Sequence, residues 1–265
     1  MCGIAGIIDF ASGAPDERLL RRMLGTIRHR GPDACGMYCD NVAGLAHTRL
    51  SIIDLSGGDQ PIHNEDQTLW IVFNGEIFNY PELRQALKAQ GHRFYTRSDT
   101  EVLVHLYEDH GPQFVHLLNG QFALGLWDSR QQELFLARDR MGIRPLFYSV
   151  NNGGLVFASE TKALMADSNM DRALDIQALS DVFTCWAPLG PLTPFKGVRQ
   201  LLPGHCASFS TGGMQIQSYW QPPFSAPSHS HRSLDEWTEE LRGLLYDAAR
   251  IRLRADVPVG AYLSG

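Results

Sequence analysis

Short apolar runs alternate with amphipathic helical segments along most of the chain. Residues 3–8 are predicted to form a strand, and residues 16–28 a helix with one apolar face. A nearly continuous apolar run at residues 68–73 predicts another strand, and a second helix is expected to begin at Pro81 and to end at Gly91. Further strands are expected at residues 122–127, 133–137, 145–150 and 155–158. Strands that are joined by turns and flanked by helices predict an α+β fold built in layers.

The organisation changes after residue 165. Residues 2–165 are predicted to form the core of a domain, and residues 166–220 a helix and a hairpin appended to the same domain. The hairpin would pair residues 198–202 with residues 206–210 across a Pro-Gly turn. The appendage is therefore expected to lie outside the core.

A second domain is predicted to begin near residue 233. Residues 221–232 contain three prolines and alternating Ser-His, which is typical of a linker. Ser233-Leu-Asp-Glu236 has the pattern of a capping box, and an apolar helix face follows it. We therefore interpret residues 233–265 as the truncated start of a further domain.

Composition and charge restrict the class of protein. A chain of 265 residues with 44% hydrophobic content can bury a large core. The net charge is −6, from 23 basic and 29 acidic residues, so we expect no nucleic-acid partner. No apolar run approaches the ~20 residues of a membrane span, and no signal peptide is recognisable, so we expect no membrane association and a cytoplasmic location.

The cysteines and histidines predict neither disulfides nor a metal site. Five scattered cysteines in an apparently cytosolic chain do not resemble a disulfide framework. Cys35 and Cys39 come nearest to a metal-binding pair, but no second pair follows at zinc-finger spacing. The ten histidines include no i, i+4 pair around a glutamate. We therefore expect no metal ion.

Cys2 stands directly after the initiator Met1. Removal of Met1 would leave a cysteine with its own free α-amine, whose ordinary pKa of about 7.7–8.0 lies just below the thiol's ~8.5. One residue would then carry a nucleophile and the base that activates it. Taken by itself, Cys2 is more simply a small residue that opens a strand, so the rest of the chain must decide between the two interpretations.

Several segments together resemble one family. These are Met1-Cys-Gly-Ile-Ala-Gly-Ile7, Arg28-His-Arg-Gly-Pro-Asp33, His47-Thr-Arg-Leu-Ser51, Phe73-Asn-Gly-Glu-Ile77, Ser98-Asp-Thr-Glu101, Leu136-Ala-Arg-Asp-Arg-Met-Gly-Ile-Arg-Pro-Leu146 and Ala158-Ser-Glu-Thr-Lys-Ala163. In motif and spacing the chain resembles the class II glutamine amidotransferases, and within them the glutamine-hydrolysing asparagine synthetases. The resemblance implies the fold of N-terminal-nucleophile hydrolases, a four-layer αββα sandwich of antiparallel sheets. For residues 233–265 it implies a fragment of an α/β ATP-pyrophosphatase domain.

The resemblance also assigns catalytic roles. Cys2 would be the nucleophile, and the Asn74 side-chain amide and the Gly75 backbone N–H would form the oxyanion hole. Glycine suits that place because it has no Cβ to obstruct the approach of a substrate to the backbone. Without the resemblance, Asn74-Gly75 after a strand would be interpreted as a hairpin turn.

Substrate recognition is assigned in the same way. Arg49 would bind the α-carboxylate of glutamine through a bidentate contact, Asp99 would accept hydrogen bonds from the α-ammonium, and Glu76 would contribute to the same site. The alternatives are a solvated surface charge for Arg49 and a helix N-cap for Asp99. Arg30 and Gly31 are placed in a supporting loop that closes near bound glutamine.

Residues 257–265 resemble the strand that leads into the phosphate loop of asparagine synthetases, a Ser-Gly-Gly-x-Asp-Ser motif. The chain contains only the first two residues of that motif, so Leu263, Ser264 and Gly265 would belong to a truncated nucleotide site. An ordinary strand that ends at a Ser-Gly turn is the alternative. The resemblance implies no cofactor for the glutaminase half, and ATP and Mg²⁺ for the missing synthetase domain.

We therefore predict an enzyme that hydrolyses glutamine to glutamate and ammonia through a Cys2 thioester. In the full-length protein, the ammonia would serve ATP-dependent asparagine synthesis from aspartate in the missing C-terminal domain, which would be the partner of this half. One alternative is a different acceptor, such as a uronic acid or a cell-envelope carboxylate. A non-catalytic regulatory module with the same fold also stays open, as does a homodimer.

Overall fold

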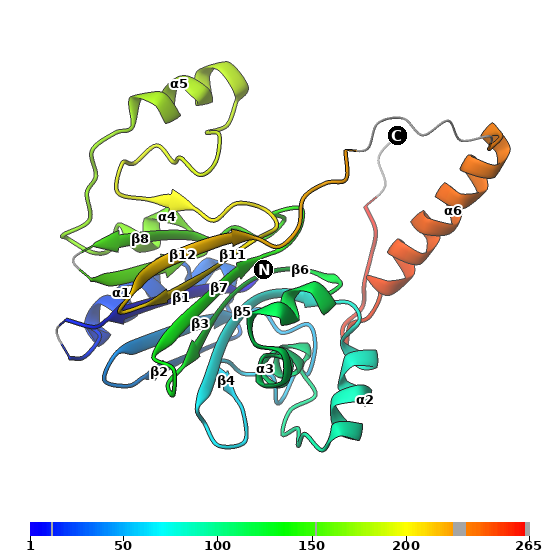
Figure 1. Ribbon diagram of the computed structural model, residues 1–265, viewed down its shortest axis with the longest axis horizontal. Coiled ribbons are helices and arrows are strands. Elements are labelled where there is room, and N and C mark those ends of the chain that lie inside the picture. Colours follow the sequence, from blue (N-terminus) through cyan, green and yellow to red (C-terminus); the bar gives the residue numbers. More distant parts are fainter. Residues whose placement is uncertain (12, 152, 225–231, 263–265) are drawn as a thin grey trace.

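The computed structural model describes residues 1–11, 13–151, 153–224 and 232–262. Two antiparallel sheets face each other (Figure 1). In order across the sheet, the first contains β10 (Arg199–Gln200), β8 (Phe147–Asn151), β9 (Gly154–Ala158), β1 (Gly3–Asp9), β3 (Ala43–Arg49) and β2 (Ala34–Cys39). The second contains β12 (Gly213–Ser218), β11 (His205–Ser210), β7 (Glu133–Arg138), β6 (Gly120–Asp128), β5 (Leu69–Ile77) and β4 (Ile62–His63).

Helices cover the outer face of each sheet. On the first sheet, α1 (Glu17–Thr26) and α4 (Thr161–Leu164) pack against β1 and β9, and the short helix η1 (Arg28–Arg30) follows α1. On the second sheet, α3 (Asp99–His110) packs against β5, with α2 (Tyr80–Gln90) beside α3. The helix η2 (Gly111–Leu117) follows α3 and places Phe114 against Phe135 of β7. The arrangement is the expected αββα sandwich.

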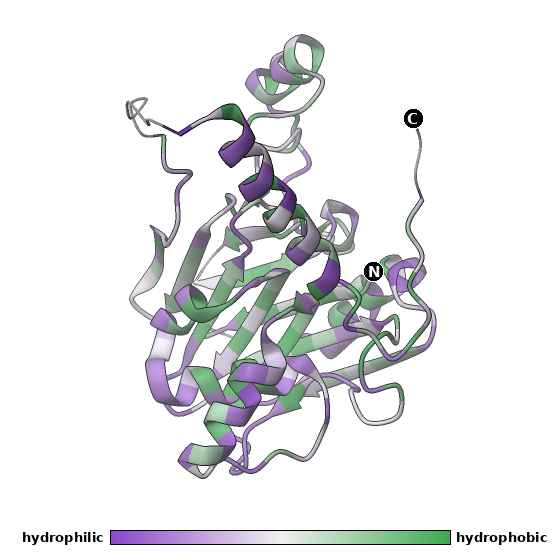
Figure 2. Cartoon of the chain, turned by 90° about the vertical axis from the view of Figure 1, so that its right-hand side faces the viewer, coloured by the Kyte–Doolittle hydropathy of each residue, from purple (hydrophilic) through white to green (hydrophobic). Residues whose placement is uncertain are grey.

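Along each strand, successive side chains point alternately into two different apolar cores, because neighbouring residues of a strand face opposite sides of the sheet. In β1, Ile4 and Ile8 point between the sheets, whereas Ala5 and Ile7 point toward α1. The strands appear largely hydrophobic in Figure 2, because both faces of most of them are covered. The sequence pattern of short apolar runs follows from this double burial.

Several predicted helix ends are confirmed, although α1 ends at Thr26 and not at residue 28. The Asp16 carboxylate caps α1 by accepting hydrogen bonds from the amides of Arg18 and Leu19, at 2.8 and 3.0 Å. Gly91 ends α2 in the left-handed conformation, with φ of 108°. Ser233 and Glu236 form the expected capping box at the start of α6 (Leu234–Ile251).

The predicted hairpin between residues 198–202 and 206–210 is wrong. Residues 199–200 form β10 and pair with β8, whereas residues 205–210 form β11 and pair with β7 in the other sheet. The observed hairpin is β11–β12, which extends the second sheet. This segment is therefore part of the sandwich, because Cys206 and Phe209 are buried on opposite faces of β11 within the two cores.

The C-terminal segment lies apart from the sheets (Figure 1). Along α6, side chains such as Leu241 and Leu244 are more than half exposed. The strand expected within residues 257–265 is not observed in its described part, residues 257–262, which pair with no other described strand. The expected linker, residues 221–232, lies largely outside the described residues. None of the described helices is long and apolar enough to cross a membrane.

Helix α5 (Ile176–Cys185) projects away from the sandwich, whereas the segment after α6 is bound to it by an ion pair and hydrogen bonds. Helix α5 projects from the first sheet (Figure 1), and its Ile176 and Phe183 side chains are exposed. After α6, the Arg254 guanidinium forms an ion pair with Glu82 on α2, at 2.7 Å. The Asp256 amide donates to the Ile52 carbonyl at 2.9 Å, and its carboxylate accepts from the Asp54 amide at 2.7 Å.

Glycine governs the approach of the two sheets at one point. Gly6 in β1 and Gly125 in β6 face the ring of Phe157, which is fully buried. A Cβ at Gly125 would lie 2.5 Å from the Cζ atom of Phe157, well inside van der Waals contact. The ring cannot move aside without displacing other core residues, because interiors are close-packed.

We predict that Gly125→Ala lowers the free energy of unfolding by about 1–3 kcal/mol, because it overpacks the core between the sheets. Gly25→Ala is the matched control. Gly25 lies within α1 with nothing near its added Cβ, so alanine should raise the free energy of unfolding by up to about 1 kcal/mol. Urea unfolding of both variants measures the difference. Equal stability of the two variants would contradict this account of the core.

Candidate active site

Three side chains converge at one end of the space between the sheets. Cys2 lies two residues before Ile4, so it shares the face of β1 that points between the sheets. Arg49 lies on the same face of β3 as Leu45, which also points between the sheets. In the facing sheet, Asn74 lies on the same face of β5 as Val72, which points toward the first sheet. Because β1 begins where the antiparallel β3 ends, Cys2 and Arg49 lie beside each other, opposite Asn74.

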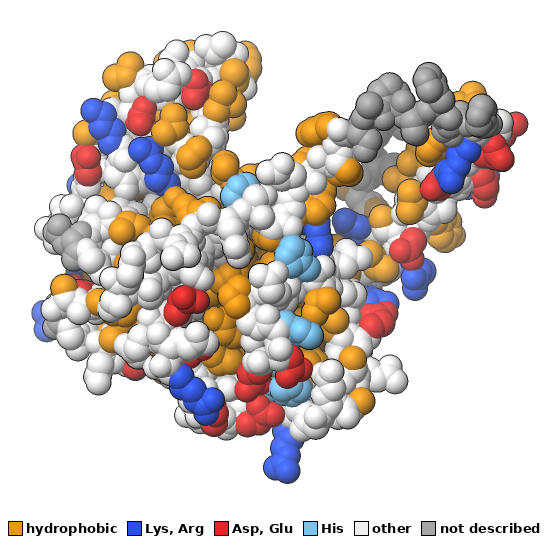
Figure 3. All heavy atoms as spheres, viewed as in Figure 1, with side chains coloured by type: hydrophobic (Ala, Val, Ile, Leu, Met, Phe, Trp, Pro, Cys, Tyr) orange, Lys and Arg blue, Asp and Glu red, His pale blue; other side chains and the backbone are white. Residues whose placement is uncertain are grey.

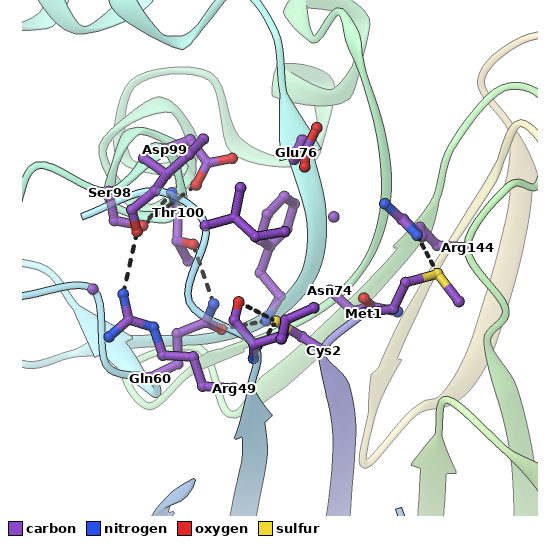
Figure 4. Close-up of a pocket in the computed structure, with 16 residues that line it drawn as sticks. Met1, Cys2, Arg49, Gln60, Asn74, Glu76, Ser98, Asp99, Thr100 and Arg144 are labelled. Atoms are coloured by element: carbon purple, nitrogen blue, oxygen red, sulfur yellow. Dashed lines mark hydrogen bonds between the residues drawn. The ribbon is translucent and has the colours of Figure 1, made fainter. Parts of the chain in front are cut away.

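A pocket opens at this point (Figure 4). It brings together six residues that the sequence predicted to be in the site: Cys2, Arg49, Asn74, Gly75, Glu76 and Asp99. They come from the start of β1, the end of β3, the end of β5 and the first residue of α3. The remaining lining residues are Met1, Leu50, Ile52, Ile53, Gly58, Gln60, Phe73, Ser98, Thr100 and Arg144.

The Cys2 thiol lies against the backbone of Leu50. The Leu50 amide donates to Sγ at 3.4 Å, and the thiol donates to the Leu50 carbonyl at 3.6 Å. Burial raises the pKa of the thiol, whereas the amide contact and the nearby Arg49 charge lower it. Burial also lowers the pKa of the α-amine of Met1, and the Arg30 and Arg144 charges act in the same direction. The Met1 amine is therefore more readily uncharged than an ordinary N-terminus.

Asn74 presents an unused donor. Its side chain is 1% exposed, and within the described chain Nδ2 has no hydrogen-bond partner. A buried amide without a partner is costly, which indicates a group kept free for a ligand. The hairpin-turn interpretation of Asn74-Gly75 is wrong, because both residues pair with β6 inside β5.

Gly75 is required for a reason that the sequence argument did not give. A Cβ at Gly75 would lie 2.2 Å from the carbonyl oxygen of Gln121 and 2.8 Å from the Cα of Phe122. The close approach that needs glycine is therefore between β5 and β6. A side chain at this position would clash with the neighbouring strand, whereas the sequence argument explained Gly75 by the approach of a substrate.

Arg49 is 5% exposed, so the surface-charge interpretation is wrong. Its guanidinium donates to the Asp59 carboxylate at 2.7 Å and to the carbonyls of Ile53 and Asp54. The Asp59 side chain is 69% exposed. A free carboxylate that entered the pocket would therefore compete with a solvated partner for the same fork of donors.

Asp99 is not the helix cap. Ser98 occupies that position and accepts from the Thr100 amide at 3.1 Å. The Asp99 carboxylate instead accepts from the Ile77 amide at 3.0 Å and is 4% exposed. Burial raises its pKa to about 6, although the Ile77 hydrogen bond favours the charged form. A buried carboxylate at the pocket wall is suited to pair with an ammonium group.

Arg30 and Gly31 lie behind the pocket and do not line it. Arg30 Nε donates to the Cys2 carbonyl at 2.9 Å, and its Nη1 donates to the Glu160 carboxylate at 2.9 Å. A Cβ at Gly31 would lie 2.2 Å from the backbone of Thr48. Both residues therefore anchor the start of β1 and the end of β3. Their predicted role in loop closure stays a prediction.

Sequence reasoning missed several pocket residues. Gln60 Oε1 accepts from the Phe73 amide at 2.6 Å, and its Nε2 donates to Thr100 at 3.2 Å, so it links β5 to α3. Arg144 lines the pocket, contacts the Met1 sulfur, and its Nε has no partner among the described residues. Arg144 lies within one of the quoted segments, whereas no motif pointed to Gln60.

His47 is a buried neighbour of the site. It points between the sheets like Arg49 and is 1% exposed. Burial lowers its pKa to about 3, so the imidazole is neutral at physiological pH. The residues expected to start a nucleotide site, Leu263, Ser264 and Gly265, lie outside the described residues.

Comparison with known families agrees with this arrangement. The family model of the glutamine amidotransferase domain matches residues 1–220. The chain belongs to this family. A second model, that of asparagine synthase, matches residues 240–265 of this amidotransferase chain. The boundary between the two matches falls after β12.

Curated relatives match beyond the amidotransferase domain. Asparagine synthetases [glutamine-hydrolyzing] 3 and 1 of Bacillus subtilis are 37% and 39% identical across 100% of the chain, and across 43% and 42% of their own length. Amidase chyE of Penicillium rubens is 39% identical over 93% of the chain and 36% of its own length. The amidotransferase chain thus spans less than half the length of these relatives.

Solved structures share the fold. An allosteric regulatory enzyme of purine biosynthesis aligns with 83% of the chain and 49% of its own chain, with a TM-score of 0.62 and 22% identity. Glutamine phosphoribosylpyrophosphate amidotransferase from B. subtilis aligns over the same shares, with a TM-score of 0.59 and 21% identity. At such identities the likeness shows the αββα fold alone.

We predict that glutamine binding strengthens as the pH rises through about 6. Above that pH, Asp99 is charged and attracts the α-ammonium, whereas below it the neutral carboxyl binds poorly. Calorimetric titration of the Cys2→Ala variant measures glutamine binding without turnover. A range from pH 5 to pH 8 extends from about one unit below the pKa of Asp99 to about two units above it. Asp99→Asn in the same background should bind weakly at every pH. A pH dependence that survives in Asp99→Asn would remove Asp99 from this role.

Proposed function

We propose that this chain hydrolyses the side-chain amide of glutamine with Cys2 as the nucleophile. The observation that carries the proposal is one pocket that holds the half-buried Cys2 thiol and the unpartnered Asn74 amide donor. Hydrolysis of an amide needs a nucleophile at the carbonyl carbon and donors for the oxyanion that develops. Family membership supports the same chemistry.

The proposed reaction has two halves. After removal of Met1, the Cys2 α-amine accepts the thiol proton, directly or through a water, while sulfur attacks the amide carbon. Asn74 Nδ2 and the Gly75 N–H stabilise the oxyanion, and collapse of the tetrahedral intermediate expels ammonia with the proton that the amine held. Water then attacks the γ-glutamyl thioester with the same amine as base, which releases glutamate and restores the thiol.

Substrate recognition follows from charge. The Arg49 guanidinium binds the α-carboxylate in place of Asp59, and Asp99 binds the α-ammonium, with Glu76 on the same wall. The two charged contacts would hold glutamine by its amino-acid end and direct its amide toward Cys2. The orientation is what turns a weakly bound amino acid into a substrate.

In the full-length protein, we propose that the ammonia serves ATP-dependent amidation of aspartate to asparagine. The support is the match of residues 240–265 to asparagine synthase and the full-chain likeness to the B. subtilis synthetases. The synthetase domain would be the partner of this half and would supply the ATP and Mg²⁺ site, to which residues 263–265 would contribute. The proposed location is the cytoplasm.

A different acceptor is the second candidate. The Penicillium rubens amidase is as similar to this chain as the synthetases are. The acceptor is selected outside the glutamine pocket, so these residues do not distinguish the two activities. Amidation assays of the full-length protein with aspartate and with other carboxylates would decide between them.

We predict that Cys2→Ala abolishes glutamate release and that Cys2→Ser is severely impaired, because a hydroxyl is much harder to deprotonate than a thiol. Both variants should keep the fold, since one small side chain replaces another. Mass spectrometry of the intact N-terminus must first establish that Met1 is absent. Undiminished turnover in Met1-free Cys2→Ala would contradict the mechanism, and a retained Met1 in active protein would exclude the α-amine as base.

We predict that Asn74→Ala lowers kcat by roughly 10²–10³, because one oxyanion donor is lost. Arg49→Lys is the contrasting variant. It should chiefly raise KM, because an ammonium cannot reproduce the bidentate contact. Steady-state glutaminase kinetics separate the two effects. If Asn74→Ala changed KM alone, Asn74 would be a binding residue and not an oxyanion donor.

A further inference from the structure

A second cluster of chemically active side chains lies away from the glutamine pocket, on the outer side of the second sheet. Four side chains direct one potential ligand atom each into a space where all four atoms lie within 4.8 Å of one another. They are Glu65 in the β4–β5 turn, His92 after α2, and His105 and Glu108 on α3. Acidic and histidine side chains lie side by side over this part of the visible surface (Figure 3).

We propose that these four residues bind a divalent transition metal ion of the zinc type. Two imidazole nitrogens and two carboxylate oxygens are ligands that Zn²⁺ takes in four-coordinate sites. Ligands about 2.0–2.2 Å from the ion stand about 3.3 Å apart at the corners of a tetrahedron. The His105 Nδ1 atom lies 2.8 Å from Glu108 Oε2 and 3.5 Å from Glu65 Oε2. His92 Nδ1 lies 3.5 Å from Glu108 Oε2.

The His92 nitrogen that faces away from the cluster is held by another group, because His92 Nε2 lies 3.1 Å from both carboxylate oxygens of Asp109. A carboxylate behind an imidazole fixes the ring and directs its other nitrogen at a metal. His105 Nε2 has no hydrogen-bond partner among the described residues, and the nearby Glu101 carboxylate lies 3.8 Å away, so the packing around its buried ring holds His105 in place.

The two glutamates are oriented in the same manner. Glu65 Oε1 accepts from the Arg93 amide at 2.9 Å, and Glu108 Oε1 accepts from Asn64 Nδ2 at 2.9 Å. Each glutamate thus keeps its second oxygen for the cluster. The imidazole of His105 is fully buried, so one ligand is fixed by the core while the others come from surface segments.

A bound ion would join three segments that are distant in the sequence. It would tie the β4–β5 turn and the chain after α2 to α3, the helix whose first residue is Asp99 in the pocket. The role we assign to the ion is structural, because binding to the folded state alone stabilises that state. The site lies outside the lining of the glutamine pocket and takes no part in the proposed hydrolysis.

The test is titration of the metal-free full chain with ZnCl2, followed by calorimetry and thermal unfolding. We expect one zinc ion per chain and a Tm that rises on binding. His92→Gln and Glu65→Gln should each abolish both effects, and His116→Gln, which alters an exposed histidine outside the cluster, should abolish neither. Asp109→Asn should weaken zinc binding roughly 10–100-fold, because only the outer carboxylate is lost.

Zinc-edge X-ray absorption identifies the ligand atoms. A shell of nitrogen and oxygen alone, near 2.0–2.2 Å by the usual zinc distances, would support the proposal. Sulfur in the shell would overturn it by placing the ion at a cysteine. Unchanged zinc affinity in His92→Gln, or no binding to the wild-type chain, would show that the cluster is a set of ion pairs only.

Discussion

The antiparallel pairing of β1 with β3 is the constraint on which the site depends. Gly3 lies opposite Thr48, so Cys2 is placed beside the end of β3 and its thiol meets the Leu50 backbone. A shift of one residue in the register of β1 would turn Cys2 toward α1 and away from Arg49. Arg30 and Gly31 secure the register from behind, through the Cys2 carbonyl and the close approach to Thr48.

Burial then gives these side chains their chemical character. The same enclosure that raises the pKa of Asp99 leaves the Asn74 amide without a partner and removes Arg49 from bulk water. Each of these features costs stability in the absence of a ligand and strengthens electrostatic contacts in its presence. The apolar core between the sheets, to which Phe157 belongs, contributes the hydrophobic stabilisation that offsets this cost.

Helix α3 connects the pocket to the second cluster. Its first residue is Asp99, and two turns later it presents His105 and Glu108 to the surface segments around Glu65 and His92. The sequence predicted no metal site, because its ligands come from three segments with no shared spacing. The register of a helix against a sheet, which no local pattern encodes, brings them together.

Much of the fold and the site was readable from the sequence, because local rules and the motif spacing concern neighbouring residues. The start of the first helix at Asp16, the capping box at Ser233 and the strand periodicity are of this kind, whereas the six pocket residues followed from the family resemblance of their motifs. Strand partners were not readable, since β10 and β11 look alike locally and yet join different sheets. The reason for Gly75, the partners of Arg49 and the role of Gln60 likewise depend on atoms that only the packing of the two sheets brings within contact.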